Sequence, residues 1–295
     1  MKKNIFVAIL LITLAVSAFG IMMLQKKEEE KESDVVQVVT SFYPMYIAAL
    51  NVINESPAIE LENLSEPQTG CLHDFQLTPE DMKLLSEADV FIINGGGMES
   101  FLEDVYTQYP DLVVIDTSKD IEMIDDNAHF WMEFSKYQTQ IDAIAQGLGE
   151  AAPSSAETLQ QNAVDYKDKI EALREETEMV NELTQGSSVV IFHEAFEYLA
   201  QDYGIRIAET LDLDEERQVS ANEVADLLTT IQSENIGKVF AEELYGSEMG
   251  QTVMRETTAK VYYLNTLSRG EYEKDSYING MKENIQIITK AYEVR

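Results

Sequence analysis

The stretch SSAETLQQNAVDYKDKIEALREETEMVNEL, residues 154–183, decides the fold that the sequence predicts. It contains no proline or glycine and is rich in Ala, Leu, Glu, Lys and Gln, which are good helix formers. We therefore expect one long helix from about Ser154 to Leu183. Strand and helix patterns alternate on both sides of this stretch, so the helix separates the chain into two halves.

The half before the long helix has the pattern of a parallel α/β layer. Apolar, β-branched runs at 35–40, 90–94 and 112–115 are typical of buried strands. Thr78 followed by Pro79 and two acids has the pattern of a capped helix start. Repeated strand-then-helix units predict a parallel sheet. The other helices predicted in this half are 45–53 and 98–106.

The same alternation resumes after Gly186. The predicted strands are 189–192, a short one around Ile207, 238–241 and 261–264, and the predicted helices are one ending at Tyr203, 224–233 and 277–292. The fold class predicted is α/β, with two lobes that each contain a mostly parallel sheet flanked by helices and are joined by one long helix. We expect the lobes at 35–150 and 186–295 and the linking helix at 151–185.

The first residues predict export. Residues 5–24 are uncharged and mainly apolar, with lysines on both sides. Such a segment can span a bilayer as an uncleaved anchor, whereas small residues up to Gly20 suit cleavage after that position. Residues 1–25 are therefore a signal peptide or an N-terminal membrane anchor, and the charged run at 26–34 would be a tether. We expect an extracytoplasmic protein, at the cell surface or in a periplasm, either tethered to the membrane or secreted.

The net charge argues against nucleic acid as a partner, and the cysteine content argues against a disulfide or a lipid anchor. The formal net charge is −33, and such a negative field repels the backbone of a nucleic acid. Nucleic acid is therefore not an expected partner. Cys71 is the only cysteine, so no disulfide forms within the chain, and no cysteine follows the apolar segment to carry a lipid.

Three histidines, His73, His129 and His193, are the candidate metal ligands. Their spacing matches no local metal motif, but each stands where a loop meets a predicted helix or strand. Three neutral imidazoles that converge from different loops leave an open position on a tetrahedral zinc ion. They also release the metal when they are protonated, so we expect affinity to fall below about pH 6.

The segments around these histidines resemble the metal-binding solute-binding proteins of ABC importers for zinc and manganese, in particular the zinc-type high-affinity uptake group. The resemblance covers nearly all of the exported region, and the three histidines fall in order on that family's ligand positions. The segments that carry it are SFYP at 41–44, CLHDFQLTP at 71–79, DVFIING at 89–95, AHFWM at 128–132 and FHEAFEY at 192–198.

This resemblance implies a function. The protein would be the extracytoplasmic substrate-binding component of an ABC importer, capturing zinc in a cleft between the lobes and delivering it to a membrane permease and its ATPase. His73 and His129 would come from the first lobe and His193 from the second. Histidine at the third position favours zinc over manganese as the transported ion. No phosphate-loop motif is present, and we expect a monomer that is not an enzyme.

The fourth ligand is open in the sequence. The family usually supplies an acid from a strand end in the second lobe, but the matching stretch around Asn265 has none. Asn265, Glu242, Glu271, Cys71 or a water molecule could complete the coordination sphere. A thiolate at Cys71 would be a strong zinc ligand, and the alternative is a small residue packed in its loop.

Two other functions are compatible with a three-histidine site. A zinc-dependent metallohydrolase would need a general base, for which Asp74 and Glu194 stand next to a histidine. A surface adhesin would use the metal only for its structure. Turnover of an ester or amide would favour the hydrolase, and tight, non-exchanging zinc would favour the adhesin.

Overall fold

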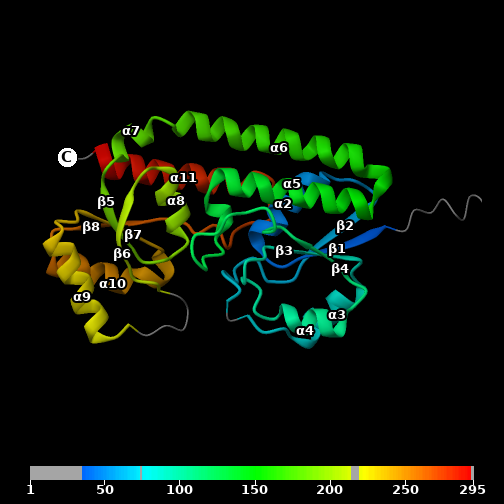
Figure 1. The fold of residues 1–295 in the computed structure, drawn as a ribbon, viewed down its shortest axis with the longest axis horizontal. Helices are drawn as coiled ribbons and strands as arrows, with labels where there is room; N and C mark the ends of the chain where they lie inside the picture. Colours follow the sequence, from blue (N-terminus) through cyan, green and yellow to red (C-terminus); the bar gives the residue numbers. More distant parts are fainter. Residues whose placement is uncertain (1–34, 74, 214–218, 294–295) are drawn as a thin grey trace, which may run out of the picture. The chain divides into compact units, whose positions relative to one another are not determined.

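The computed structural model describes residues 35–73, 75–213 and 219–293, and Figure 1 shows the fold. The predicted signal peptide or anchor at 1–25, the tether at 26–34 and Asp74 lie outside the described residues. Every helix in the described part is too short or too polar to span a bilayer.

The first sheet has four parallel strands. They are β1 (Val36–Thr40), β2 (Ile59–Asn63), β3 (Val90–Ile93) and β4 (Val113–Asp116), in the order β2-β1-β3-β4. β2 is absent from the sequence prediction because its apolar residues alternate with acids in a short run at the sheet edge. The other strands lie within two residues of their predicted bounds, since continuous Val and Ile runs are typical of strands in a parallel sheet.

The second sheet repeats this topology. Its parallel strands are β5 (Ser188–Ile191), β6 (Arg206–Thr210), β7 (Lys238–Ala241) and β8 (Lys260–Tyr263), in the order β6-β5-β7-β8. In both sheets the strand that comes first in the sequence holds the second position, and the strand that comes third in the sequence lies next to it. The two-lobe α/β prediction is confirmed, and the lobes share a topology although no sequence repeat relates them.

This strand order fixes where ligands can approach. Parallel strands direct all their carboxyl ends to one edge, and the crevice opens where successive connections leave on opposite sides of the sheet. That point lies between β1 and β3 in the first sheet and between β5 and β7 in the second. At the first of these edges Glu99 accepts hydrogen bonds from Ser41 Oγ and from the backbone N–H groups of Asn94 and Gly95, at 2.8, 2.8 and 3.0 Å.

The helices of the first lobe follow its strands. Thr78 caps α3 in a capping box with Asp81, as its pattern predicts. The predicted helix 98–106 begins only at Leu102, and α5 is absent from the sequence prediction. The helices are α2 (Tyr43–Ile53), α3 (Pro79–Glu87), α4 (Leu102–Gln108), the 3-10 helix η1 (Phe130–Met132), α5 (Phe134–Ala151) and the 3-10 helix η2 (Pro153–Ser155).

The long linking helix is α6 (Ala156–Thr177), which packs against α5 (Figure 1). It ends before the predicted Leu183, and a short helix, α7 (Val180–Thr184), follows. At the end of α6 the hydroxyl of Thr177 donates to the backbone oxygens of Leu173 and Arg174 and contacts the hydroxyl of Tyr203. The residues around this end are good helix formers, so helix propensity alone does not reveal it.

The second lobe contains α8 (Phe196–Asp202), α9 (Ala221–Ser233), α10 (Glu243–Glu256) and α11 (Ser276–Glu293). The sequence does not predict α10, whose Gly246 and Gly250 lower its helix propensity. Both glycines allow a close approach to the sheet. A Cβ at Gly246 would lie 2.8 Å from the Cβ of Ala241, and one at Gly250 would lie 2.8 Å from the hydroxyl of Tyr263.

Two hydrophobic clusters form the core. The larger one includes side chains of β1, β3, α2, α5 and α6 and continues into α8 and α11. The smaller one lies between β7, α9 and α10. The larger cluster joins side chains of both lobes, so apolar burial as well as the linking helix holds the two sheets in one body.

Replacing Thr78 with Ala removes the side chain that accepts the backbone N–H of Asp81. We expect the free energy of unfolding to fall by about 1 kcal/mol, which urea denaturation will measure. Thr229→Ala is the control, because the hydroxyl of Thr229 bonds only the Ala225 oxygen within α9. Equal losses in the two variants would contradict a capping role.

Candidate metal centre

All three predicted histidines lie on segments that follow the carboxyl ends of strands. His73 belongs to the loop after β2, His129 directly precedes η1, and His193 follows β5. The ring centroid of His129 lies 5.4 Å from that of His73 and 5.1 Å from that of His193. Imidazoles from both lobes therefore meet in one place, and His129 neighbours both of the others.

His129 is completely buried and is held by Asn127. Its backbone N–H and its ring Nδ1 both contact Oδ1 of Asn127, at 3.0 and 2.9 Å. Because an amide oxygen only accepts hydrogen bonds, Nδ1 carries the ring proton and Nε2 keeps its lone pair. Asn127 also donates to the backbone oxygen of Glu194 at 2.9 Å and to Glu197 Oε2 at 3.0 Å. A contact between the lobes thus fixes His129 with Nε2 ready to bind a metal.

His193 has the opposite arrangement. Its Nδ1 accepts the backbone N–H of Ala195 at 3.1 Å, so the proton of the neutral ring lies on Nε2. A metal-bound ring carries its proton on the nitrogen that does not bind the ion, so the Ala195 N–H loses its acceptor whichever nitrogen binds. Ala195 is the N-cap residue of α8, so a metal ion bound by His193 would remove a hydrogen bond at the start of that helix.

His73 is the most exposed of the three, with 38% of its side chain accessible. Its Nε2 atom is nevertheless enclosed and has no hydrogen-bond partner among the residues that the structure describes. Oε1 of Glu194 lies 3.9 Å from this nitrogen and 3.3 Å from Nδ1 of His129. A buried polar atom without a partner requires an explanation, and a ligand position supplies one.

Potential ligands form two overlapping groups among the described residues, each with donor atoms within 4.8 Å of one another. One group is Cys71, His129 and His193, and the other is His73, His129 and Glu194. His129 belongs to both. The three predicted histidines do not form so close a group by themselves, so a thiol and a carboxylate enter the site beside them.

The predicted candidates for a fourth ligand differ in their surroundings. Asn265 and Glu271 are exposed, and Oδ1 of Asn265 accepts the backbone N–H of Leu267 at 2.7 Å. Glu242 is buried, and its Oε1 lies 3.1 Å from Nη2 of Arg269, which neutralises its charge. These three residues belong to neither group, whereas Cys71 belongs to one.

Burial shifts the proton affinities of the site. It lowers the pKa of His193 to about 3, with His129 as the second cause, and lowers the pKa of His129 well below its ordinary value, with His73 as the second cause. Both rings are therefore neutral and able to bind a metal at neutral pH. Burial also raises the pKa of Cys71 to about 12, and the Glu242 carboxylate adds to this rise.

Asn127 is a residue that the sequence prediction misses. Its side chain accepts the N–H two residues later, which is a common local role of Asn. The spacing Asn-x-His is the only sequence signal for its contact with the imidazole, and that signal is weak. Glu194 is named in the sequence prediction only as a possible base, because its closeness to His73 depends on the packing of the lobes.

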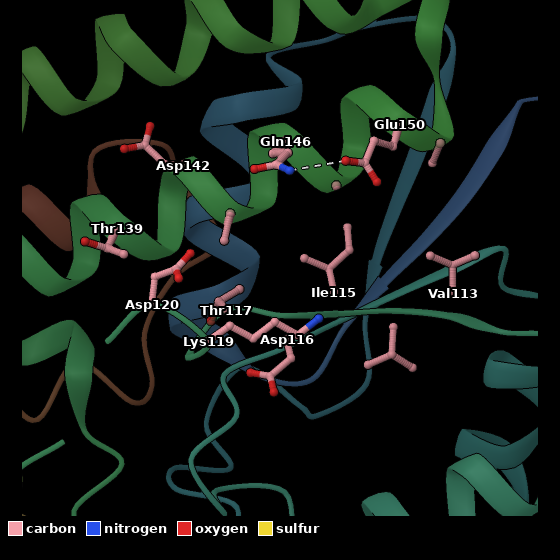
Figure 2. A pocket seen from close by; sticks show the side chains of 14 residues that line it. Val113, Ile115, Asp116, Thr117, Lys119, Asp120, Thr139, Asp142, Gln146 and Glu150 are labelled. Atoms are coloured by element: carbon pink, nitrogen blue, oxygen red, sulfur yellow. Dashed lines mark hydrogen bonds between the residues drawn. The ribbon is translucent and has the colours of Figure 1, made fainter. Parts of the chain in front are cut away.

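A cavity of 660 Å³ lies away from this site. Residues of β4 and α5 line it, and none of the three histidines does. Figure 2 shows acidic side chains around it, including Asp116, Asp120 and Asp142, together with the hydrogen bond from Gln146 to Glu150. The cavity lies beside β4, the outer strand of the first sheet in the described part of the chain.

Two parallel α/β lobes joined by a long helix, with buried imidazoles contributed by both lobes, define the class of metal-binding solute-binding proteins. The family described as zinc-uptake complex component A, periplasmic, matches residues 38–291, and the chain belongs to this family. It is a substrate-binding transport protein of an ABC zinc uptake system, and the resemblance predicted from the sequence is confirmed.

Relatives agree with this placement. The chain is 24% identical to the high-affinity zinc uptake system protein ZnuA of Bacillus subtilis, with 92% of each chain covered. It is 27% identical to the iron-binding protein YfeA of Yersinia pestis, over 87% of this chain and 86% of the relative. The solved structure of FpvC from Pseudomonas aeruginosa in complex with Mn2+ has the same fold, with a TM-score of 0.80, 23% identity, and coverage of 88% of this chain and 98% of that one.

The metal-free protein should lose stability in acid through His193. The unfolded ring has a pKa of about 6.5 and the folded ring one of about 3, so the unfolded state binds more protons as pH falls. Between pH 7 and 5 this costs about 2 kcal/mol, and His193→Gln should remove that part of the loss. Urea denaturation at both pH values in the presence of a chelator will measure it.

The comparison must be made between wild type and variant. Burial raises the pKa of Glu99 and of Asp202 to about 7, and these groups act in the opposite direction. Equal pH dependence in wild type and His193→Gln would show that His193 is not held neutral by the fold.

Replacing Asn127 with Ala should lower zinc affinity about 10–100-fold, because the His129 ring loses the acceptor that fixes its tautomer. Competition with a chromophoric chelator measures the affinity. Asn127→Asp keeps an acceptor and should lose less. Asn162→Ala is the control, since its amide donates to the backbone oxygen of Val52, away from the site. A similar loss in Asn127→Ala and Asn162→Ala would refute the role of Asn127.

Proposed function

We propose that the protein captures one Zn2+ ion between its lobes with His73, His129 and His193 and delivers it to a membrane permease driven by an ATPase. The observation that carries this proposal is the contact between His129 of the first lobe and His193 of the second, with ring centroids 5.1 Å apart. A ligand that contacts both lobes stabilises their closed arrangement by its binding energy.

The donor types support zinc as the transported ion. Imidazole nitrogens suit zinc better than they suit the harder manganese ion, which prefers oxygen donors. A relative named for iron and a neighbour crystallised with manganese show that related proteins bind other metals. The nitrogen-rich site of this chain therefore supports Zn2+ over Mn2+.

The remaining parts of the proposal concern the whole chain. We place the lobes at 35–150 and 186–295, with 151–185 as the linking segment. The protein acts as an extracytoplasmic monomer, and its N-terminal segment either tethers it to the membrane or is removed. Membership of a transport family favours this function over a hydrolase or an adhesin with structural metal.

Acid should weaken zinc binding, but at a lower pH than the value of about 6 that the sequence predicts. Protons compete with the metal for the same nitrogens, but the lowered pKa values of His129 and His193 move their competition below the ordinary histidine range. These two rings therefore remain metal ligands in mildly acidic solution.

Isothermal calorimetry of the purified protein should find one zinc site. His129→Ala should lose more affinity than Asn127→Ala, and His73→Ala and His193→Ala should each lose at least tenfold, because each removes a direct donor. Glu87→Ala, which removes an exposed acid of α3 outside both groups of potential ligands, serves as the control for a substitution away from the site. Undiminished binding in the three histidine variants would overturn the proposed site.

A further inference from the structure

Cys71 lies at the metal centre, and a site made of the three histidines alone gives it no role. Sγ of Cys71 lies 3.4 Å from Nε2 of His129, and both belong to a group with His193 whose donor atoms lie within 4.8 Å of one another. The cysteine is thus not isolated, because two buried imidazoles share its site.

The hydrogen bond between Cys71 and His129 has a defined direction. The protonated Nδ1 of His129 donates a hydrogen bond to Oδ1 of Asn127. Nε2 can therefore only accept a hydrogen bond, and the thiol of Cys71 donates it. One proton therefore lies between a sulfur and a nitrogen that both bind zinc well. A divalent ion that replaces this proton contacts both donors.

The distance between the two donor atoms fits such an ion. Tetrahedral zinc has Zn–S bonds of about 2.3 Å and Zn–N bonds of about 2.0–2.1 Å, which place the two donors about 3.5 Å apart. The observed separation of 3.4 Å needs almost no movement. Cys71 and His129 are therefore already spaced as neighbouring ligands.

The other candidates for a fourth ligand are less well placed. Glu242 is engaged by Arg269, and Asn265 and Glu271 are exposed outside both groups of potential ligands. Glu194 is the remaining competitor, since its Oε1 lies 3.3 Å from Nδ1 of His129. That nitrogen carries the hydrogen that it donates to Asn127, so Glu194 lies beside the protonated nitrogen of the ring, whereas Cys71 lies beside the nitrogen that has a lone pair.

We propose that Cys71 is the fourth donor to the captured ion, and that the centre consequently selects thiophilic divalent ions such as Zn2+ and Cd2+ over Mn2+. This inference rests on the proposed function, in which the histidines bind the metal. On binding, the S–H bond breaks, the proton passes to solvent and a metal–sulfur bond forms without any change of oxidation state. Soft thiolate ligands favour zinc-like ions, whereas manganese prefers oxygen donors.

Cobalt(II) substitution tests this directly in the full-length protein, purified in detergent under reducing conditions. A cobalt–thiolate bond gives a charge-transfer absorption in the near ultraviolet that nitrogen and oxygen ligands do not give. We expect this band in the wild type and in Glu194→Gln, and no such band in Cys71→Ser or Cys71→Ala. Thermal unfolding of the metal-free variants checks that each is folded.

Affinities for Cd2+ and Mn2+ give the second readout. Cys71→Ser should lose at least about tenfold in Cd2+ affinity, the smallest loss typical of removing an outer-shell partner of a ligand, while its Mn2+ affinity changes little. A wild type without the charge-transfer band, or equal Cd2+ affinity in wild type and Cys71→Ser, overturns the inference. So does a loss of zinc affinity in Glu194→Gln that Cys71→Ser does not share, because the carboxylate would then be the fourth ligand.

The two proposals fail in different ways. If the histidine variants bind zinc as well as the wild type, the proposed function is wrong. If the histidines are required, but the Cys71 variants match the wild type in cobalt absorption and in Cd2+ affinity, only the thiolate inference is wrong.

Discussion

Parallel pairing of β1 with β3 and of β5 with β7 is the constraint on which the rest of the molecule depends. Parallel strands place all their carboxyl ends at one edge, so the connecting loops that carry function gather there. The three histidines, Cys71 and Glu242 all stand on segments that follow strand ends. The site is thus assembled from loops at the carboxyl edges of the two sheets, and no single local motif contains it.

The burial of the imidazoles has both a cost and a use. Removing a histidine from water disfavours its charged form, which keeps His129 and His193 neutral and ready for a cation. A buried polar atom also needs a hydrogen-bond partner, and Oδ1 of Asn127 accepts the hydrogen bond of Nδ1 of His129. Because Asn127 also bonds the backbone of Glu194 in the other lobe, one side chain links ligand orientation to the contact between lobes.

Strong local signals predict the observed elements, and weak ones do not. The Val and Ile runs of β1, β3, β5 and β7 and the Thr78 cap are encoded within a few residues, so they appear in the sequence prediction. The edge strand β2 has only short alternation, and the two glycines of α10 reduce its helix propensity although they serve close packing on the sheet. The end of α6 lies within a run of good helix formers, so no local pattern marks its position.

The sequence by itself determined the fold class, the parallel strands of buried apolar residues and the identity of the three histidines as candidate ligands, because each of these depends on residue type and local pattern. Only the tertiary structure decided which further side chains join them. The nearness of Cys71 to His129, the bond from Asn127 to Glu194 and the pairing of Glu242 with Arg269 join residues far apart in sequence. Such contacts depend on how the loops and lobes pack, and no local pattern in the chain records them.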